Sequence, residues 1–416
     1  MAGLESKKIA LGLSTVFAAS GLAIVPQSIS RSTQNTGQEL RGVWLTNVDS
    51  DVLFSQDRLN TGIKRLAKLN FNTIYPTVWN AGHTLYPSQV AFQSTGETHR
   101  LYPDSKATGQ RDSREAAQRD RDMLKELIAV ARRENLHVVP WFEFGFMAPA
   151  NSELVKRHPD WVTQRRDGSK IVMKEGIHPR VWLNPFHPGV QKFLIDLASE
   201  VVTRYDVDGI QFDDHFGLPA PWGYDPYTVN LYRKEHKWKR PSRIATNPEW
   251  VRWRASKLTA FMGKLHQAVK AKNPKVTISL SPNPARFAYK WYMQDWVTWE
   301  KRGYIDELVL QVYRTDRKGF LSELQRPEVI RAKRRIPVSI GILSGLKNQN
   351  VSMNWIQKQV KWTRSHKFAG VSFFFYETLL TSKTESLAQR STGLQTLFPN
   401  PIRRSSISEG WKFSKK

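Results

Sequence analysis

The chain has 416 residues, of which 40% are apolar and 24% charged, and this composition excludes wholesale disorder and a polytopic membrane protein. Lysine and arginine number 63 against 37 aspartate and glutamate residues, and the formal charge of +26 favours an anionic partner such as an acidic glycan, nucleic acid or an anionic membrane surface. The absence of cysteine excludes disulfides, Cys-ligated zinc and iron–sulfur clusters.

Residues 1–25 have the pattern of a targeting segment. Two lysines precede an uncharged apolar run over residues 9–25, which is typical of a secretory signal and lies at the short limit for a membrane span. The sequence therefore predicts an exported protein, in the periplasm, in the cell envelope or outside the cell. An uncleaved N-terminal anchor and a buried N-terminal helix are the alternatives. Residues 26–38 are rich in Ser, Thr, Gln and Asn and are predicted to be a linker.

Residues 39–400 alternate between strand-like and helix-like patterns. Eight short apolar or β-branched runs are predicted to be strands: 41–48, 72–79, 137–144, 208–213, 276–281, 307–313, 337–342 and 370–376. Apolar residues three and four positions apart, such as Leu59, Ile63 and Leu66, predict helices in several of the intervening segments. Eight strands alternating with helices indicate the α/β class and a (β/α)8 TIM barrel, with a doubly wound open sheet as the alternative.

The connections after the second, third and fourth predicted strands are long, spanning residues 81–120, 145–188 and 215–253. Because each follows a strand, all three are expected on the C-terminal face of the barrel, where barrel enzymes carry their active sites. The last segment, residues 401–416, is basic and polar, and it is predicted to be an unstructured tail.

Strand alternation predicts which side chains face the barrel axis. The apolar set of each strand should face the helices, and the other set should face inward. In strand 208–213 this places Gln211 and Asp213 inside, and in the third strand it places Trp141 and Glu143 inside. The residues predicted to bind substrate lie on these inward sets or just beyond the strand ends: Trp79, Asn80, Trp141, Gln211, His215, Asn283, Gln311 and Tyr376.

Glu143 and Asp213 are two inward carboxylates near the ends of neighbouring strands. Glycoside hydrolysis uses such a pair, one residue protonating the leaving oxygen while the other attacks or stabilises the sugar centre. Burial and mutual repulsion would keep one of them protonated. A purely structural hydrogen-bonded pair is the alternative. Asp214, Tyr313 and Glu377 are supporting or alternative catalytic candidates, and Asp214 could instead bind a metal or cap the following loop.

A family resemblance rests on several short segments in fixed order. They are Glu39-Leu40-Arg41-Gly42-Val43-Trp44, Asn72-Thr73-Ile74-Tyr75-Pro76, His158-Pro159-Asp160-Trp161, Trp182-Leu183-Asn184-Pro185, Asp208-Gly209-Ile210-Gln211-Phe212-Asp213-Asp214 and Gln311-Val312-Tyr313. In order and spacing the chain resembles glycosyl-hydrolase-like family 10 over about residues 39–377. The resemblance implies a (β/α)8 barrel and hydrolysis of a bacterial cell-envelope glycan, in some relatives peptidoglycan strands stripped of their peptides. It places the family's acidic motif on Asp213 and Asp214.

Residues 208–213 also resemble the fourth-strand motif of chitinase-like barrels. The acid expected two residues after the last inward aspartate is replaced here by His215, and Gln211 stands where that motif has an aspartate. Substrate-assisted hydrolysis, with Asp213 and Tyr313 orienting an N-acetyl group, is therefore an alternative that requires a different acid.

Two functions of different class follow from these patterns. The first is a glycoside hydrolase acting on a cell-envelope polysaccharide, expected to be anionic; the second is an inactive barrel that binds glycan as an envelope scaffold. The sequence predicts no cofactor and no metal, since it contains no HExxH spacing and no phosphate-binding glycine loop. No nucleic-acid partner is predicted, because the basic residues form no known reading module. Peripheral or N-terminal membrane association is an alternative.

Overall fold

The computed structural model describes residues 37–101, 121–174 and 178–407. Parallel strands form the central sheet of this part of the chain: β1 (Leu40–Leu45), β2 (Thr73–Pro76), β5 (His137–Val138), β6 (Trp141–Phe142), β10 (Gly209–Asp213), β11 (Thr277–Ser281), β12 (Glu307–Gln311), β13 (Val338–Leu343) and β16 (Gly370–Phe374). Their order in the sheet is β5-β2-β1-β16-β13-β12-β11-β10-β6.

The two ends of this strand order meet, so the sheet is a closed barrel. β5 pairs with β2 while β6 pairs with β10, and only Val139 and Pro140 separate β5 from β6 along the chain. A bridge between Thr77 and Trp141 continues the contact between β2 and β6. The predicted strand 137–144 is thus one barrel strand interrupted at Pro140, which has no N–H to donate. The predicted (β/α)8 barrel is confirmed, and the open sheet is excluded.

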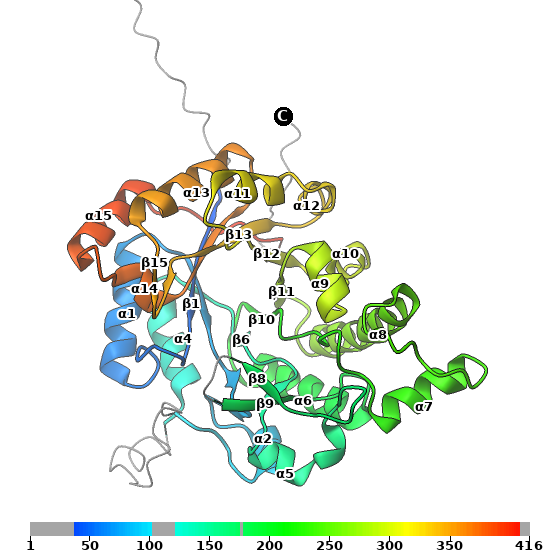
Figure 1. Cartoon of the computed structure of the whole chain (residues 1–416). Helices are drawn as coiled ribbons and strands as arrows, with labels where there is room; N and C mark the ends of the chain where they lie inside the picture. Colours follow the sequence, from blue (N-terminus) through cyan, green and yellow to red (C-terminus); the bar gives the residue numbers. More distant parts are fainter. Residues whose placement is uncertain (1–36, 102–120, 175–177, 408–416) are drawn as a thin grey trace, which may run out of the picture. The chain divides into compact units, whose positions relative to one another are not determined.

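Helices lie outside the strands (Figure 1). They are α1 (Gln56–Lys68), α4 (Met123–Arg133), α6 (Pro188–Arg204), α8 (Pro248–Lys272), α10 (Trp296–Lys301), α11 (Arg317–Leu324), α12 (Pro327–Ala332), α13 (Met353–Ser365) and α15 (Leu387–Leu397). In α1 the Ser55 side chain caps the helix by accepting from the Arg58 N–H. The predicted apolar stripe of α1, Leu59, Ile63 and Leu66, is buried.

The remaining elements lie in the connections that follow barrel strands. They are β3 (Trp79–Asn80), β4 (His83–Thr84), α2 (Gln89–Thr95), β7 (Met147–Pro149), α5 (Glu153–Arg157), η1 (Pro159–Trp161), β8 (Val172–Lys174), β9 (His178–Trp182), α7 (Pro226–Glu235), α9 (Ala285–Tyr292), β14 (Gly345–Leu346), β15 (Gln349–Asn350) and α14 (Tyr376–Leu380). Because all of them follow the C-terminal end of a strand, they build the face on which the predicted carboxylates lie.

The barrel separates two apolar cores. The larger core lies between the outward strand residues, such as Ile210 and Phe212, and the surrounding helices. The smaller core fills the barrel axis and is mostly aromatic: Trp44, Tyr75, Val139, Trp141, Val309 and Phe375, with Phe374 packed against it. The division follows the alternation of side chains along the strands, as predicted.

The described part of the predicted tail, residues 401–407, is ordered on the amino end of the barrel. Arg404 is 2% exposed; its Nη2 donates to Glu307 Oε2 at 2.6 Å and its Nε donates to Thr73 Oγ1 at 3.0 Å. The prediction of an unstructured tail is wrong for this stretch, because the inward Glu307 of β12 is a buried charge that binds a cation. Residues 408–416 lie outside the described residues.

The predicted targeting segment and most of the predicted linker fall on residues 1–36, which also lie outside the described residues, so export stays a prediction. Among the helices of the described ranges, none is long and apolar enough to cross a membrane.

Candidate active site

The two predicted carboxylates come from neighbouring barrel strands. Asp213 is the last residue of β10, and Glu143 follows β6 directly. The strand register pairs Phe142 with Phe212, so the next residue on each strand is one of the two acids. Strand pairing therefore brings Glu143 and Asp213 to the same level at the C-terminal end of the barrel.

One oxygen of Glu143 is held by three neutral donors. Oε2 accepts from Thr46 Oγ1 at 3.2 Å, from Thr77 Oγ1 at 3.1 Å and from Asn80 Nδ2 at 2.9 Å. Burial, followed by the charge of Asp213, raises the pKa of Glu143 to about 7. The other oxygen, Oε1, accepts no hydrogen bond from the described residues, so an oriented and protonated acid can present it to a ligand.

Asp213 is held by donors on both oxygens and is 3% exposed. Trp141 Nε1 donates to Oδ2 at 3.1 Å, and the backbone N–H of His215 donates to Oδ1 at 2.8 Å. Burial raises the pKa of Asp213 to about 6, against the lowering effect of His215. Two N–H donors and His215 favour the charged form of Asp213, whereas the charge of Asp213 disfavours that of Glu143. Acid–base catalysis on a glycosidic bond needs one ionised and one protonated acid of this kind.

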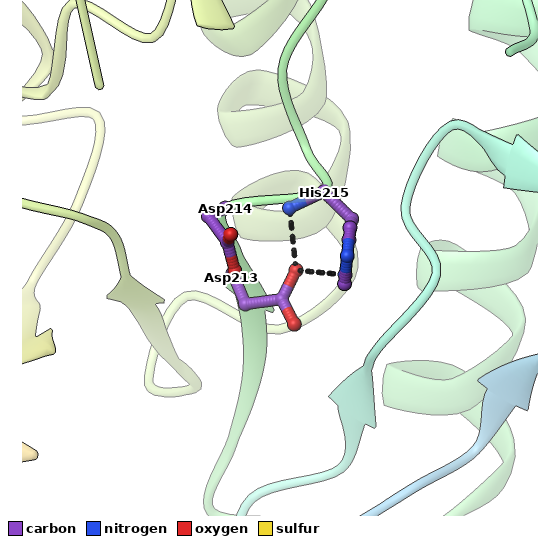
Figure 2. Close-up of side chains that lie close together, drawn as sticks. All are labelled: Asp213, Asp214 and His215. Carbon is purple, nitrogen blue, oxygen red and sulfur yellow. Dashed lines mark hydrogen bonds and ion pairs between the residues drawn. The ribbon is translucent and has the colours of Figure 1, made fainter. Parts of the chain in front are cut away.

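His215 connects the two strand ends. Its Nδ1 lies 2.8 Å from the backbone carbonyl oxygen of Glu143 and 3.5 Å from Asp213 Oδ1. A carbonyl oxygen only accepts, so Nδ1 carries a proton in this arrangement. Figure 2 shows both interactions of the Asp213 carboxylate with His215, one through the backbone and one through the ring.

Asp214 is oriented by two amides from the next strands. Asn283 Nδ2 donates to Oδ2 at 3.0 Å, and Gln311 Nε2 donates to Oδ1 at 3.2 Å. Burial, followed by the nearby charges of Asp214 and Asp213, raises the pKa of Tyr313 well above its usual value. The structure thus brings together the predicted residues of the fourth, fifth and sixth strands around one acidic centre.

The three consecutive residues at the end of β10 could hold a cation. Ligand atoms of Asp213, Asp214 and His215 lie within 4.8 Å of one another. Each oxygen of the two carboxylates also accepts an N–H donor of the protein, which holds both groups in place. The sequence predicts no metal here, and that stays a prediction.

Two predicted substrate-binding residues lie beneath the acids, where they act as supports. Gln211 is fully buried; its Oε1 accepts from Trp44 Nε1 at 2.6 Å and its Nε2 donates to Ser279 Oγ at 2.9 Å. Trp141 is 3% exposed and packs edge-on against Trp44, with ring centroids 6.4 Å apart. The Trp141 ring presents little surface for stacking on a sugar, but its N–H positions Asp213.

Trp79 does not face the barrel mouth, contrary to the prediction. Its ring is fully buried in the outer core against Phe193 of α6, at a centroid distance of 5.3 Å, and its Nε1 donates to the Gly145 carbonyl. The reason is that β2 ends at Pro76, and Trp79 belongs to the separate hairpin of β3 and β4, where the alternation of the barrel strand no longer applies. The adjacent Asn80 does reach Glu143.

Tyr376 and Glu377 also turn away from the acidic centre. Tyr376 is buried beside α1, where its hydroxyl accepts from Arg65 Nη1 at 3.3 Å, and Glu377 Oε1 accepts from Ser50 Oγ at 2.5 Å. Both line a hollow of about 320 Å³ next to α1. The predicted inward direction of Tyr376 is wrong because β16 ends at Phe374 and α14 starts at Tyr376, which changes the direction of successive side chains.

Three residues that contact the acids were absent from the predicted site. Thr46 and Thr77 donate to Glu143, and Gln294 Nε2 donates to the backbone oxygen of Asp213 at 2.7 Å. Strand alternation already predicts that Thr77 faces inward, although it is not among the predicted site residues, and the same rule at the end of the first strand would have identified Thr46. Gln294 lies in the connection between α9 and α10, where no periodic pattern marks it.

Comparison with known proteins agrees with this barrel and its acidic end. The family model described as "Glycosyl hydrolase-like 10" matches residues 39–364. The chain belongs to this family. Its predicted family resemblance is thereby confirmed.

Curated relatives of this glycosyl-hydrolase-like protein are distant. "Glycosyl hydrolase DigH" of Escherichia coli is 24% identical over 329 residues, covering 68% of this chain and 67% of the relative. "Glycosyl hydrolase YngK" of Bacillus subtilis is 23% identical over 177 residues, 39% of this chain and 29% of the relative.

Among solved structures, the PgaB (BpsB) glycoside hydrolase domain from Bordetella bronchiseptica superposes with a TM-score of 0.57. It is 15% identical, and the match covers 81% of this chain and 94% of that domain. At this identity the likeness shows a shared barrel fold.

Proposed function

We propose that this glycosyl-hydrolase-like protein is an active glycoside hydrolase that cleaves an anionic polysaccharide of the cell envelope. Glu143 is the general acid, and its free Oε1 protonates the leaving oxygen of the glycosidic bond. Asp213, ionised at a lower pH, stabilises the positive charge that develops on the sugar or activates the group that attacks it. His215, Trp141 and Asn80 position these two acids.

The observation that carries this proposal is a pair of neighbouring acids, a buried Asp213 and a partly buried Glu143. Among the described residues, Glu143 accepts from neutral donors only. Three hydroxyl and amide donors fix one Glu143 oxygen, and no cation forms an ion pair with it in the described residues. A partly buried acid fixed in this way is oriented without being forced to ionise, and the pKa of Glu143 rises to about 7. General acids in enzymes require this combination of position and protonation.

An anionic envelope glycan is proposed as the substrate on three grounds. The chain carries a formal charge of +26, and its N-terminal apolar run has the pattern of an export signal. The family resemblance points to peptidoglycan strands stripped of their peptides. Such strands keep the lactyl carboxylates of muramic acid, so a basic protein attracts them.

The test is to incubate purified protein with intact and peptide-stripped peptidoglycan and to identify released reducing ends by mass spectrometry. We expect release from the stripped strands by the wild-type protein and none by Asp213→Asn, which removes the charge while keeping the shape. Tight binding of strands without release of any product by the wild-type protein would contradict hydrolysis and favour an inactive glycan-binding scaffold.

A further inference from the structure

Helix α9 presents an aromatic and basic surface that the two-acid centre does not use. Arg286, Phe287, Lys290 and Trp291 are all exposed, whereas the one fully buried residue of the helix is Ala288. Phe287 is 47% and Trp291 42% exposed, which is high for rings of this size. The spacing of three and four places the four side chains on one side of the helix, here called the α9 face.

The α9 face is fixed to the acidic centre at both ends of the helix. Asn283, two residues before α9, donates to Asp214, and Gln294, two residues after it, donates to the Asp213 carbonyl. The carbonyl oxygens of Trp291 and Tyr292 also accept backbone N–H donors of the connection that follows β10, at 2.8 and 2.7 Å. The α9 face therefore has a fixed place beside the acids.

The chemistry of the α9 face matches a sugar polymer that carries carboxylates. Flat aromatic rings desolvate well against the C–H faces of pyranose rings and lose little conformational freedom when they do so. Arg286 and Lys290 supply positive charge on the same side, and Lys290 Nζ lies 5.3 Å from the Trp291 ring centroid. The Lys290 ammonium lies over one face of the Trp291 ring, so a carboxylate-bearing sugar that stacks on the other face lies close to a positive charge.

We propose that the α9 face binds the anionic glycan strand at sugar units beyond the bond that is cleaved. This inference rests on the proposed function, because it takes the acids at the end of β10 as the point of cleavage. Single-stranded nucleic acid also stacks on aromatic rings beside basic groups. A glycan is favoured, because Asn283 and Gln294 connect helix α9 directly to the two aspartates at the end of β10.

The test measures binding of peptide-stripped glycan strands to the full chain carrying Asp213→Asn, so that cleavage does not interfere. Adding Phe287→Ala and Trp291→Ala together should weaken binding by about tenfold or more. Adding Arg286→Gln and Lys290→Gln instead should weaken binding at low salt and reduce its dependence on salt. In the otherwise wild-type protein, the aromatic pair of substitutions should lower kcat/KM for long strands and leave cleavage of the shortest cleavable fragments unchanged.

Trp238→Ala is the matched control. Trp238 is also an exposed tryptophan, at 62%, with the Arg233 guanidinium 5.1 Å from its ring centroid, but it follows α7, which lies farther from β10 than α9 does (Figure 1). If the α9 variants bind strands as tightly as the control, or if single-stranded DNA binds the α9 face more tightly than glycan does, the inference is overturned. If Asp213→Asn binds strands through the α9 face while the wild-type protein cleaves none, the proposed hydrolysis fails, and only the part of the inference that assigns glycan binding to the α9 face stands.

Discussion

Each end of the barrel axis contains a hydrogen-bonded carboxylate, Glu307 at the amino end and Glu143 at the carboxyl end. Glu307 is buried, Glu143 is partly buried, and their hydrogen-bond donors differ in charge. At the amino end, Glu307 accepts from Arg404 at 2.6 Å, from Ser279 at 2.9 Å and from Tyr75 at 3.1 Å, so a cation neutralises it. At the carboxyl end, Glu143 accepts from neutral donors alone among the described residues, and none of them donates to its Oε1. The comparison indicates that the hydrogen-bond partners of such an acid, more than its burial, distinguish a neutralised structural charge from the reactive acid that we propose Glu143 to be.

The largest expected effect contrasts acids from the two ends. Asp213→Asn should lower kcat on a cleavable glycan by about 10³-fold or more while the melting temperature stays close to wild type, because catalysis needs the charge and packing does not. Glu307→Gln should do the reverse, destabilising the fold while the activity per folded molecule is kept. Activity assays and thermal denaturation of both variants check this. Comparable losses of activity per folded molecule in the two variants would remove the distinction.

The next effect concerns the cation at the amino end. Arg404→Ala leaves Glu307 buried without its ion-pair partner, and breaking a buried pair in this way costs about 3–5 kcal/mol of unfolding free energy. Denaturant unfolding measures the loss. Arg403→Ala is the control, because Arg403 is exposed and its backbone carbonyl, which Ala keeps, accepts from the Glu39 N–H at 2.9 Å. A similar stability for both variants would show that Arg404 does not neutralise Glu307 in solution.

A smaller effect is expected at Trp141. Trp141→Phe keeps a ring in the barrel axis but removes the N–H that donates to Asp213, and a hydrogen bond to a charged group contributes about 1.5–3 kcal/mol. We expect kcat to fall by roughly tenfold or more and the acidic limb of the pH–rate profile to move to higher pH, since the N–H favours ionised Asp213. If the acidic limb of the pH–rate profile of Trp141→Phe lies at the same pH as in the wild-type protein, Trp141 contributes only to packing.

The smallest expected effect is that Glu143→Gln is more stable than the wild-type protein at alkaline pH. A pKa of Glu143 raised to about 7 means that the folded state holds this proton more tightly than the unfolded chain does, so the stabilisation is present at low pH and is lost as pH rises through 7. Glu143→Gln should therefore melt higher than wild type at alkaline pH, by roughly 2–4 °C per kcal/mol recovered, with little difference at acidic pH. Equal melting temperatures at every pH would show that Glu143 ionises without cost.

Much of the barrel could be predicted from the sequence because strand alternation is a local pattern. The outward apolar set of each strand packs on helices, so parity identified Asp213, Glu143, Trp141 and Gln311 as inward. The same rule failed at Trp79 and Tyr376, where it was extended beyond the last residue of β2 and of β16. Alternation has no meaning once the backbone leaves the strand.

Other features could not be predicted because their cause is distant in the sequence. In the sequence, Arg404 is one of several basic residues in a polar segment, and nothing near it indicates its ion-pair partner Glu307, which lies 97 positions earlier. The roles of His215 and Gln294 likewise depend on where backbone carbonyls of Glu143 and Asp213 fall in space. Neither the composition of the chain nor the periodicity of its apolar residues indicates such contacts.

The pH dependence of kcat/KM on a cleavable glycan tests the assignment of the two acids most directly. With pKa values of about 6 for Asp213 and about 7 for Glu143, the wild-type profile should be bell-shaped, rising as Asp213 ionises and falling as Glu143 loses its proton. Glu143→Gln should lower the maximum by about 10²–10⁴-fold and abolish the alkaline fall. An unchanged bell in Glu143→Gln would contradict its role as the acid.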